Sequence, residues 1–341
     1  MPRAQLHLRC PDLAASLAFY TEELGFALER IYPADEPRVA ELDGEGVRLR
    51  LEQGPAEAPA RLRIEACVQA RQLVAPEGTR IECVPSAPDL RVPELEPALV
   101  LAPSGESSWT EGRAGMLYRD LLPGRLGGHL IASRIRIEEG GPVPDYVHFH
   151  HVRFQFIYCV SGWVRLVYED QGDPFVLRAG DCVLQPPRIR HRVLECSAGL
   201  EVIELGCPAE HATCVEHSLE LPTPDLRPER SFDGQRFVHH VASSTAWTPS
   251  EHAGYEQREL GLEAGTGGLL RARILRGEGA WSSDASAAQS WLGLLGGRLG
   301  LEDAHEVAAG GALALPGGAS HRLRSLDGPL ELFELRLPGP A

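Results

Sequence analysis

The stretch that decides the fold is Val147–Trp163, which reads VHFHHVRFQFIYCVSGW. Short apolar runs broken by polar residues predict β-strands here rather than a helix. His148 and His150 lie two residues apart, so on a strand both side chains point to the same face. Gln155 follows five residues after His150, and Gly162 lies seven residues beyond Gln155. Two imidazoles on one face of a strand make metal binding the first function to consider.

A second segment, GDCVLQPPRIRH, spans Gly180–His191 and places Pro186 six residues after its first glycine. Two neighbouring strands of a small barrel would bring His191 onto the face that carries His148 and His150. Three convergent imidazoles suit Fe, Zn, Ni, Cu or Mn in a catalytic site with open coordination positions. We therefore expect one divalent metal ion at this place.

Together the two segments resemble the two motifs of the cupin superfamily, G-x5-H-x-H-x3–4-E-x6-G and G-x5-P-x-G-x2-H. The spacing within each motif is kept, with three departures. Gln155 stands where the motif has Glu, Arg188 stands where it has Gly, and Gly141 leaves one extra residue before His148. The resemblance implies a small β-barrel with a metal held by His148, His150 and His191.

The glutamine has a chemical consequence. An amide cancels no charge, so three neutral imidazoles on a divalent metal would leave a net charge of +2. Such a site favours an anionic co-ligand, for example a carboxylate, enolate, phenolate or thiolate. Gln155 is either a fourth ligand through its carbonyl oxygen or a hydrogen-bond partner of a bound ligand, and the residues leave both open.

Three other side chains near the motif are candidates for a role in the site. Arg153 would face inward only if the strand runs on unbroken, and would then anchor an anionic substrate; otherwise it is a rim residue. Cys159 shares the inward parity of Gln155 and is either a core residue or a thiol facing substrate. His151 points the other way, and would replace His150 as a ligand only through a β-bulge.

The C-terminal block repeats the second motif at Gly310, Pro316, Gly318 and His321. Aligning its first motif on Gly297 puts Ser283, Ala285 and Ser290 at the ligand positions, and a single histidine cannot hold a catalytic metal. The resemblance thus implies two cupin β-barrels (double-stranded β-helices) in tandem. We expect one with metal at residues 106–222 and one without at residues 231–341, joined by the proline-rich segment Leu221–Arg230.

Residues 1–105 have a different pattern. A strand at Gln5–Cys10, a helix at Asp12–Leu24 and three strands predict a βαβββ unit; the three strands are Ala27–Tyr32, Arg38–Leu42 and Val47–Glu52. This α+β unit, with its phrase SLAFYTEELGF, resembles a module of the vicinal-oxygen-chelate family of glyoxalase and bleomycin-resistance proteins. Segments 61–68, 80–84 and 98–102 would form a shortened second module.

The ligand positions of that family fall on Gln5 and near Arg50. An arginine is not a metal ligand, so the resemblance implies a degenerate domain used as a scaffold or for dimerisation.

The amino-acid composition argues against several classes of function. The chain has 33 basic and 48 acidic residues, a formal charge of −15, which argues against binding to nucleic acid or to an anionic membrane. There is no lysine, so a lysine Schiff base and a P-loop are excluded. Eight irregularly spaced cysteines, no apolar run of spanning length and no visible signal peptide predict a cytoplasmic protein with reduced thiols.

The mainly-β bicupin is therefore expected to be a metal-dependent enzyme. Several cupins with three histidine ligands are oxygenases, so the resemblance implies a mononuclear Fe(II) dioxygenase acting on a small organic acid or phenol. A non-redox Zn or Mn enzyme (isomerase, lyase or hydrolase) and a non-catalytic ligand-binding or regulatory bicupin are the alternatives. We expect a small anionic substrate as the partner, and a homodimer is an open alternative to the monomer.

Overall fold

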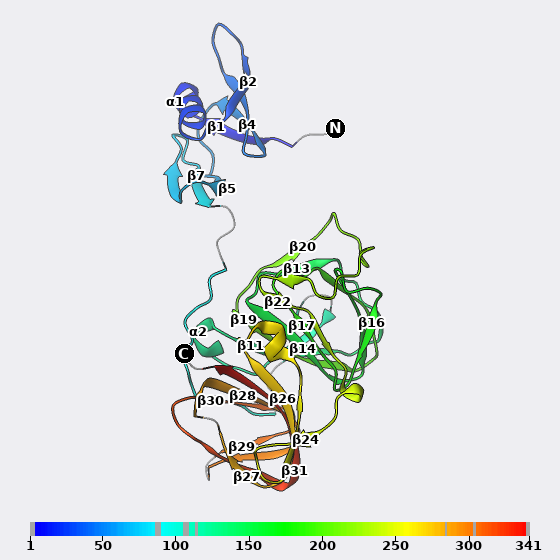
Figure 1. Cartoon of the computed structure of the whole chain (residues 1–341). Coiled ribbons are helices and arrows are strands. Elements are labelled where there is room, and N and C mark those ends of the chain that lie inside the picture. The colour runs from blue at the N-terminus through cyan, green and yellow to red at the C-terminus, as the bar shows by residue number, and fades with distance from the viewer. Residues whose placement is uncertain are drawn as a thin grey trace. The chain divides into compact units, whose positions relative to one another are not determined.

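The computed structural model describes residues 4–85, 90–104, 109–112, 115–283, 285–302 and 305–338. The chain forms two compact units, Met1–Asp89 and Leu90–Ala341, and β-strands dominate both (Figure 1). The mainly-β prediction is confirmed.

The first unit begins with the expected βαβββ order. Its elements are β1 (Leu6–Cys10), α1 (Leu13–Ala18), the π-helical turn η1 (Phe19–Glu23), β2 (Ala27–Tyr32), β3 (Val39–Gly44) and β4 (Val47–Gln53). The strands form a sheet in the order β1-β4-β3-β2, with β1 parallel to β4. The side chain of Asp12 accepts a hydrogen bond from the Ala15 amide at 2.9 Å, which caps the start of the helix.

Three further strands complete this unit: β5 (Arg61–Cys67), β6 (Arg71–Val74) and β7 (Arg80–Pro85), in the order β5-β7-β6. The strand expected at 98–102 as part of the same unit is β8 (Val100–Ala102), and it pairs instead with β30 (Ala312–Pro316) of the second unit. The expected boundary at residue 105 lies outside the described residues, but the pairing of β8 places that strand with the second unit. A strand's own sequence does not reveal which distant strand will pair with it.

The first barrel consists of two sheets, with strand orders β23-β17-β14-β19-β11-β10-β9 and β16-β15-β18-β13-β20. Its elements are β9 (Thr110–Glu111), β10 (Leu117–Asp120), α2 (Arg125–Gly128), β11 (Ile131–Ile137), β12 (Gly141–Pro142), β13 (His148–His150), β14 (Phe154–Ser161), β15 (Trp163–Tyr168), β16 (Phe175–Arg178), β17 (Cys182–Gln185), β18 (His191–Cys196), β19 (Leu200–Cys207) and β20 (Thr213–Val215). A connecting segment follows, with β21 (Ser231–Phe232), β22 (Gln235–Arg236), β23 (Val238–His240) and the 3-10 turn η3 (Ala242–Ser244).

The second barrel is one sheet in the order β24-β25-β26-β31-β28-β30-β8, with β27 and β29 pairing at its sides. Its elements are β24 (Thr248–Pro249), β25 (Tyr255–Glu259), α3 (Leu262–Thr266), β26 (Arg271–Gly277), β27 (Ala280–Ser282), β28 (Ala287–Leu301), β29 (His305–Ala308), β30 (Ala312–Pro316) and β31 (Arg322–Pro338). β23 lies within the expected second domain, yet it pairs with β17 of the first barrel. A strand that follows the proline-rich segment thus completes the sheet of the first barrel.

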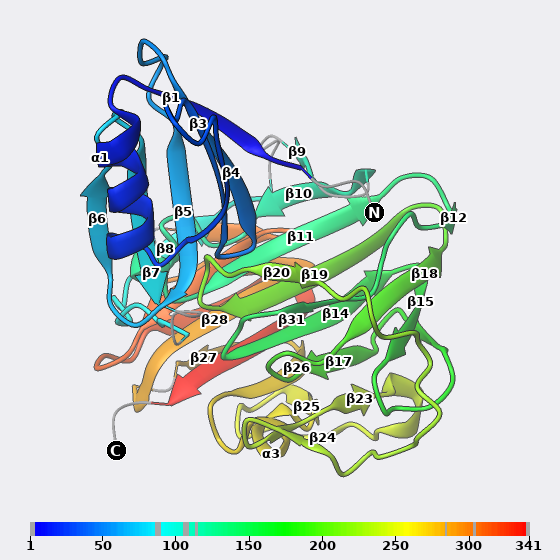
Figure 2. The ribbon, with the colours of Figure 1, turned by 90° about the horizontal axis from the view of Figure 1, so that it is seen from above.

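One face of β14 packs in a core between the two barrels, and its other face points into the first barrel. Alternate residues of β14, Phe156 and Tyr158 among them, pack in a cluster with Trp291 and Phe333 of the second barrel. The rings of Phe156 and Phe333 stack with centroids 5.3 Å apart, and Figure 2 shows β14 beside β31. Because side chains alternate along a strand, the other residues of β14 face the interior of the first barrel.

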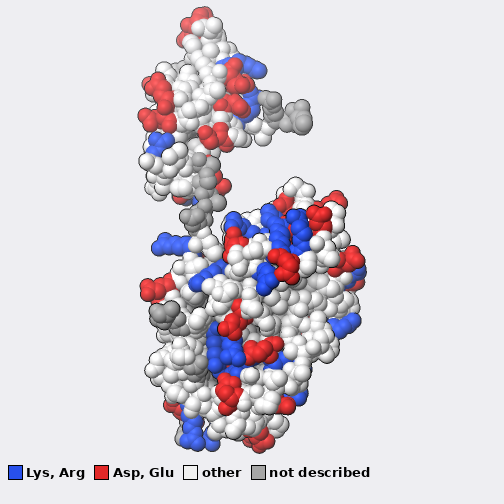
Figure 3. Space-filling view, in the orientation of Figure 1, with Lys and Arg blue, Asp and Glu red and all other residues white. Residues whose placement is uncertain are grey.

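The surface mixes charges of both signs. On the face shown in Figure 3, arginines lie among acidic side chains, and many arginines form ion pairs, as Arg190 does with Glu216 and Arg230 with Glu169. Within the described part of the chain, no helix is both long enough and apolar enough to cross a membrane.

Candidate metal centre

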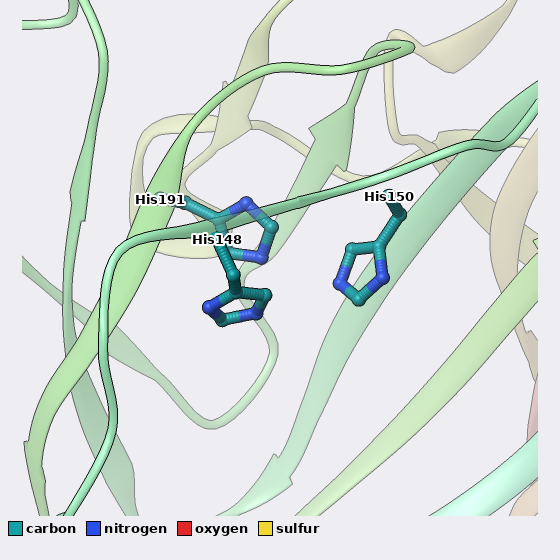
Figure 4. Close-up of side chains that lie close together, drawn as sticks. All are labelled: His148, His150 and His191. Atoms are coloured by element: carbon teal, nitrogen blue, oxygen red, sulfur yellow. The ribbon is translucent and has the colours of Figure 1, made fainter. Parts of the chain in front are cut away.

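Two neighbouring strands bring the three motif histidines together. β13 carries His148 and His150, and β18 begins at His191, which pairs directly opposite His148. One ring nitrogen from each of the three residues lies within 4.8 Å of the others, and Figure 4 shows the side chains gathered at one place. A tetrahedral metal with bonds of ~2.1 Å would hold its nitrogens roughly 3.4 Å apart. Small side-chain rotations would therefore close the group around an ion.

Each of the three rings makes a hydrogen bond through Nδ1. Nδ1 of His148 lies 2.8 Å from the Tyr146 carbonyl oxygen, and Nδ1 of His191 lies 3.0 Å from the Ile189 carbonyl oxygen. A carbonyl only accepts, so each Nδ1 carries the proton and Nε2 carries the lone pair. Nδ1 of His150 lies 2.9 Å from the Thr213 hydroxyl. Such bonds at the second ring nitrogen are what fix the tautomer of metal-binding histidines.

Gln155 points into the same barrel from β14 and is 1% exposed. Its Oε1 atom is buried and has no hydrogen-bond partner among the described residues. A buried carbonyl oxygen without a partner costs folding free energy unless a bound ion or ligand interacts with it. Three imidazoles with an available amide oxygen are a donor set that fits a divalent transition metal.

The histidines line a cavity of about 280 Å³ in the first barrel. Half of its lining residues are aliphatic, and the residues that form the wall are Met116, Tyr118, Ile135, Ile137, His148, His150, Ile157, Val164, Leu166, Tyr168, Gln185, His191, Val193, Leu200, Val202, Glu204, His211 and Thr213. The volume is close to the lower end of the ~300–1,000 Å³ range of small-molecule sites. A small organic molecule with an apolar body would fit this space.

Glu204 and His211 are two of the polar wall residues that the sequence analysis did not name. His211 lies on the segment between β19 and β20, with its ring centroid 5.4 Å from that of His150 and its Nδ1 2.9 Å from the Pro208 carbonyl oxygen. Glu204 faces inward from β19 together with Leu200 and Val202. The alternation of side chains along the strand GLEVIEL would have predicted that Glu204 points inward. His211 lies in no strand or motif, so no pattern in the sequence predicts its position.

Tyr168 and Gln185 form a polar contact in the wall, with Gln185 Nε2 donating to the Tyr168 hydroxyl at 3.0 Å. The pKa of Tyr168 is raised, chiefly because the ring is buried and further because the Glu204 carboxylate is near; the Gln185 hydrogen bond opposes both. The ring also stacks on His191 at a centroid distance of 5.4 Å. Tyr168 is thus a neutral wall residue that holds the His191 ring in place.

The other candidate residues lie outside the cavity wall. Arg153 is exposed because the chain leaves strand geometry between His150 and Phe154, so the inward parity considered for it does not arise. Cys159 is fully buried among apolar side chains, and burial raises the pKa of its thiol to about 12. His151 stacks on Phe149 and lines a different surface hollow, as its opposite strand parity predicts.

Two positions at which the motifs have glycine adopt a positive backbone φ, and one of them is occupied by arginine. Gly162 has φ of 75°, and a Cβ there would lie 2.3 Å from the Ser197 hydroxyl oxygen. Arg188 occupies the second-motif position of a glycine and also has a positive φ, 60°. Its side chain forms an ion pair with Asp233 at 2.6 Å on the surface.

The second barrel keeps the geometry of the motif but not its ligands. The His321 amide donates to the Ser283 hydroxyl at 2.9 Å, so these residues face each other as His191 and His148 do in the first barrel. Within the described residues, the three-histidine group of the first barrel has no counterpart here.

Comparison with known families and structures agrees with this description. Residues 133–202 match the cupin domain family, and residues 3–159 match the Glyoxalase/Bleomycin resistance protein/Dioxygenase superfamily. The search of curated proteins gave no match.

Solved structures of similar fold include oxalate decarboxylases. A single-substitution variant of the B. subtilis enzyme is 15% identical with a TM-score of 0.50, covering 74% of this chain and 80% of that one. The Lactobacillus farciminis enzyme in a formate complex is 13% identical with a TM-score of 0.52, covering 74% and 89%. At these identities the likeness concerns the fold, which is that of a bicupin.

Proposed function

We propose that this member of the cupin superfamily, with its glyoxalase-like N-terminal region, is a mononuclear metal-dependent enzyme. More specifically, we propose an Fe(II) dioxygenase acting on a small organic acid or phenol. The observation that carries the proposal is the group His148, His150 and His191 at the wall of an apolar cavity of about 280 Å³. A bound divalent iron would supply Lewis acidity toward an ionised oxygen and one-electron chemistry with dioxygen.

The protein's own contribution is binding, orientation and exclusion of water. The Nδ1 hydrogen bonds of His148 and His191 fix the ring tautomers and keep the rings close to the positions that an ion requires. Aliphatic side chains such as Ile135, Leu166 and Val202 enclose the apolar body of a substrate and keep water from its reacting end.

A non-redox reaction on a small acid is the second candidate, and a specific observation favours it. Such a reaction needs a proton donor or acceptor, and Glu204 and His211 supply two in the cavity wall. The oxalate decarboxylases that share the fold act on a small organic acid, as their name states. A lyase or decarboxylase of an acid with an apolar body is therefore the alternative to the dioxygenase.

One experiment separates these proposals. Protein purified without oxygen should contain about one transition metal ion per chain. The Fe-, Mn- and Zn-loaded forms are then given small phenols and carboxylic acids while dissolved oxygen and released CO₂ are recorded. Oxygen uptake by the Fe form alone supports the dioxygenase. Turnover by the Mn or Zn form under argon supports the lyase, and protein that takes up no metal contradicts both.

We also expect Gln155 to affect metal affinity. Gln155→Leu removes the buried Oε1 atom and should weaken metal binding by roughly tenfold, whereas Gln155→Glu adds a negative charge and should strengthen it. Competition with a chromogenic chelator measures both changes. Gln235→Leu is the control, because Gln235 is also buried and its Oε1 atom likewise lacks a hydrogen-bond partner among the described residues, but it lies outside both metal-binding motifs. Unchanged affinity in Gln155→Leu would mean that the amide does not act on the metal.

A further inference from the structure

His211 lies beside a position of β19 that has no side chain of its own. Leu200 and Val202 face the cavity from alternate positions of this strand, so Gly206 is a further inward position. A Cβ built on Gly206 would lie 3.5 Å from Cε1 of His211. The His211 ring, which comes from the segment after β19, therefore occupies the space that a side chain at residue 206 would point into.

One edge of the His211 ring is held by the backbone. Its Nδ1 lies 2.9 Å from the Pro208 carbonyl oxygen, and a carbonyl only accepts, so Nδ1 carries the proton. In the neutral ring, Nε2 then carries a lone pair on the edge that points away from this carbonyl. Among the described residues, the bond to Pro208 is the one hydrogen bond of the His211 ring. Because His211 lines the cavity beside His150, its Nε2 acceptor is available to a ligand.

A second acceptor lies in the same row of the wall. Gln185 is directly opposite Gln155 in the β14–β17 pair, and Gln155 is directly opposite Gly206 in the β14–β19 pair. Opposed residues of neighbouring strands share a face, so the two glutamines and the His211 ring form one row across the barrel. Gln185 is 4% exposed, and its Oε1 atom has no hydrogen-bond partner among the described residues. The row therefore presents acceptors that a ligand with hydrogen-bond donors would satisfy.

We infer that the cavity binds acids that carry a hydroxyl group on the carbon next to the carboxylate, and that His211 accepts a hydrogen bond from this hydroxyl group. The inference rests on the proposed metal centre, to which the carboxylate would bind. Because His211 adjoins the metal-binding His150, the donor has to lie close to the group that binds the metal. An acceptor that loses water to an apolar group costs binding free energy, whereas a donor in the same place compensates it. The ligand class is therefore 2-hydroxy carboxylates rather than unsubstituted ones.

Butyrate, 2-hydroxybutyrate and 2-methoxybutyrate test this inference. The hydroxy acid can donate a hydrogen bond, the methoxy acid has the same oxygen without the donor, and butyrate has neither. Their binding to metal-loaded protein is measured by calorimetry, after the metal content has been determined. The measurements are made at about pH 8, above the ordinary histidine pKa of about 6.5. We expect 2-hydroxybutyrate to bind the wild type roughly tenfold more tightly than 2-methoxybutyrate.

Substitutions of His211 assign the preference to its ring. His211→Phe keeps a ring but removes the acceptor, so it should weaken 2-hydroxybutyrate binding by roughly tenfold and change butyrate binding little. His211→Gln retains an acceptor oxygen and should keep part of the preference. His217→Phe is the matched control, because His217 is exposed and does not line the cavity. It should leave all three affinities unchanged.

Two results would overturn the inference while the measured metal content leaves the metal centre intact. One is equal binding of the hydroxy and methoxy acids to the wild type, which decides the matter even if the variants do not fold. The other is an undiminished preference in His211→Phe, because the preference would then come from chelation of the metal alone. Protein that binds no metal would overturn the proposed function instead, and the inference with it.

Discussion

His191→Ala should be purified almost without metal, whereas His321→Ala should retain the metal content of the wild type. His191 is 4% exposed and is one of three histidines whose ring nitrogens converge. Removing it leaves two neutral imidazoles, so the metal affinity should fall by about a hundredfold or more. Elemental analysis of both variants, prepared side by side, measures the effect.

His321 is a matched control because it occupies the same motif position in the second barrel. Its Nδ1 lies 3.4 Å from Glu302, and the remaining ligand positions there are Ser283, Ala285 and Ser290. Circular dichroism should show both variants folded. Metal retained in His191→Ala would disprove the assignment of the site, and metal lost from His321→Ala would mean that the second barrel also binds an ion.

The sequence predicted most of this centre because its residues follow local rules. His148 and His150 share a face through strand alternation, and the spacing from Gly180 to His191 belongs to a turn that the motif describes. Both features are set within a dozen residues of chain. Whether the three histidines hold a metal stays a prediction, but their convergence within 4.8 Å is what the spacing leads one to expect.

What the sequence analysis left open or did not name depends on features that no local pattern contains. The rim and the interior were both open for Arg153, and the Arg153 amide donates a hydrogen bond to the Cys207 carbonyl where the chain turns between β13 and β14. β8 pairs with a strand more than two hundred residues away in sequence. His211 reaches the cavity from a segment between strands. Each depends on contacts between distant parts of the chain, which alternation and spacing do not encode.

Arg273→Met should destabilise the second unit by about 3–5 kcal/mol, because it removes the centre of a buried charge network. The Arg273 side chain is 1% exposed, and Glu334, its partner through Nε at 2.5 Å, is 5% exposed. Its two terminal nitrogens donate to both oxygens of Glu251 at 2.7 and 2.8 Å. In the methionine variant, Glu334 would keep its ion pair with Arg336 but would lose Arg273, its partner on the neighbouring strand.

Urea unfolding, followed by tryptophan fluorescence, measures this loss of stability in the second unit. All five tryptophans lie beyond residue 90 and therefore report only on the second unit. Arg271→Met is the control on the same strand. Its partner Glu259 and Arg271 itself are each 41% exposed, so that variant should lose no more than about 1 kcal/mol. Equal losses in the two variants would contradict a special role for the buried network.

The same network should make the second unit sensitive to acid. The Arg273 guanidinium holds the pKa of Glu251 well below its usual range. A carboxyl whose pKa is lower in the folded state contributes stability that is fully present above its unfolded pKa of about 4.3 and is lost as the pH falls toward the folded value. The free energy of unfolding of the wild type should therefore decrease below about pH 4.3, and less steeply in Arg273→Met. Parallel pH profiles for the two proteins would show that Arg273 does not cause the shift, and that the second barrel owes its acid response to its other ion pairs.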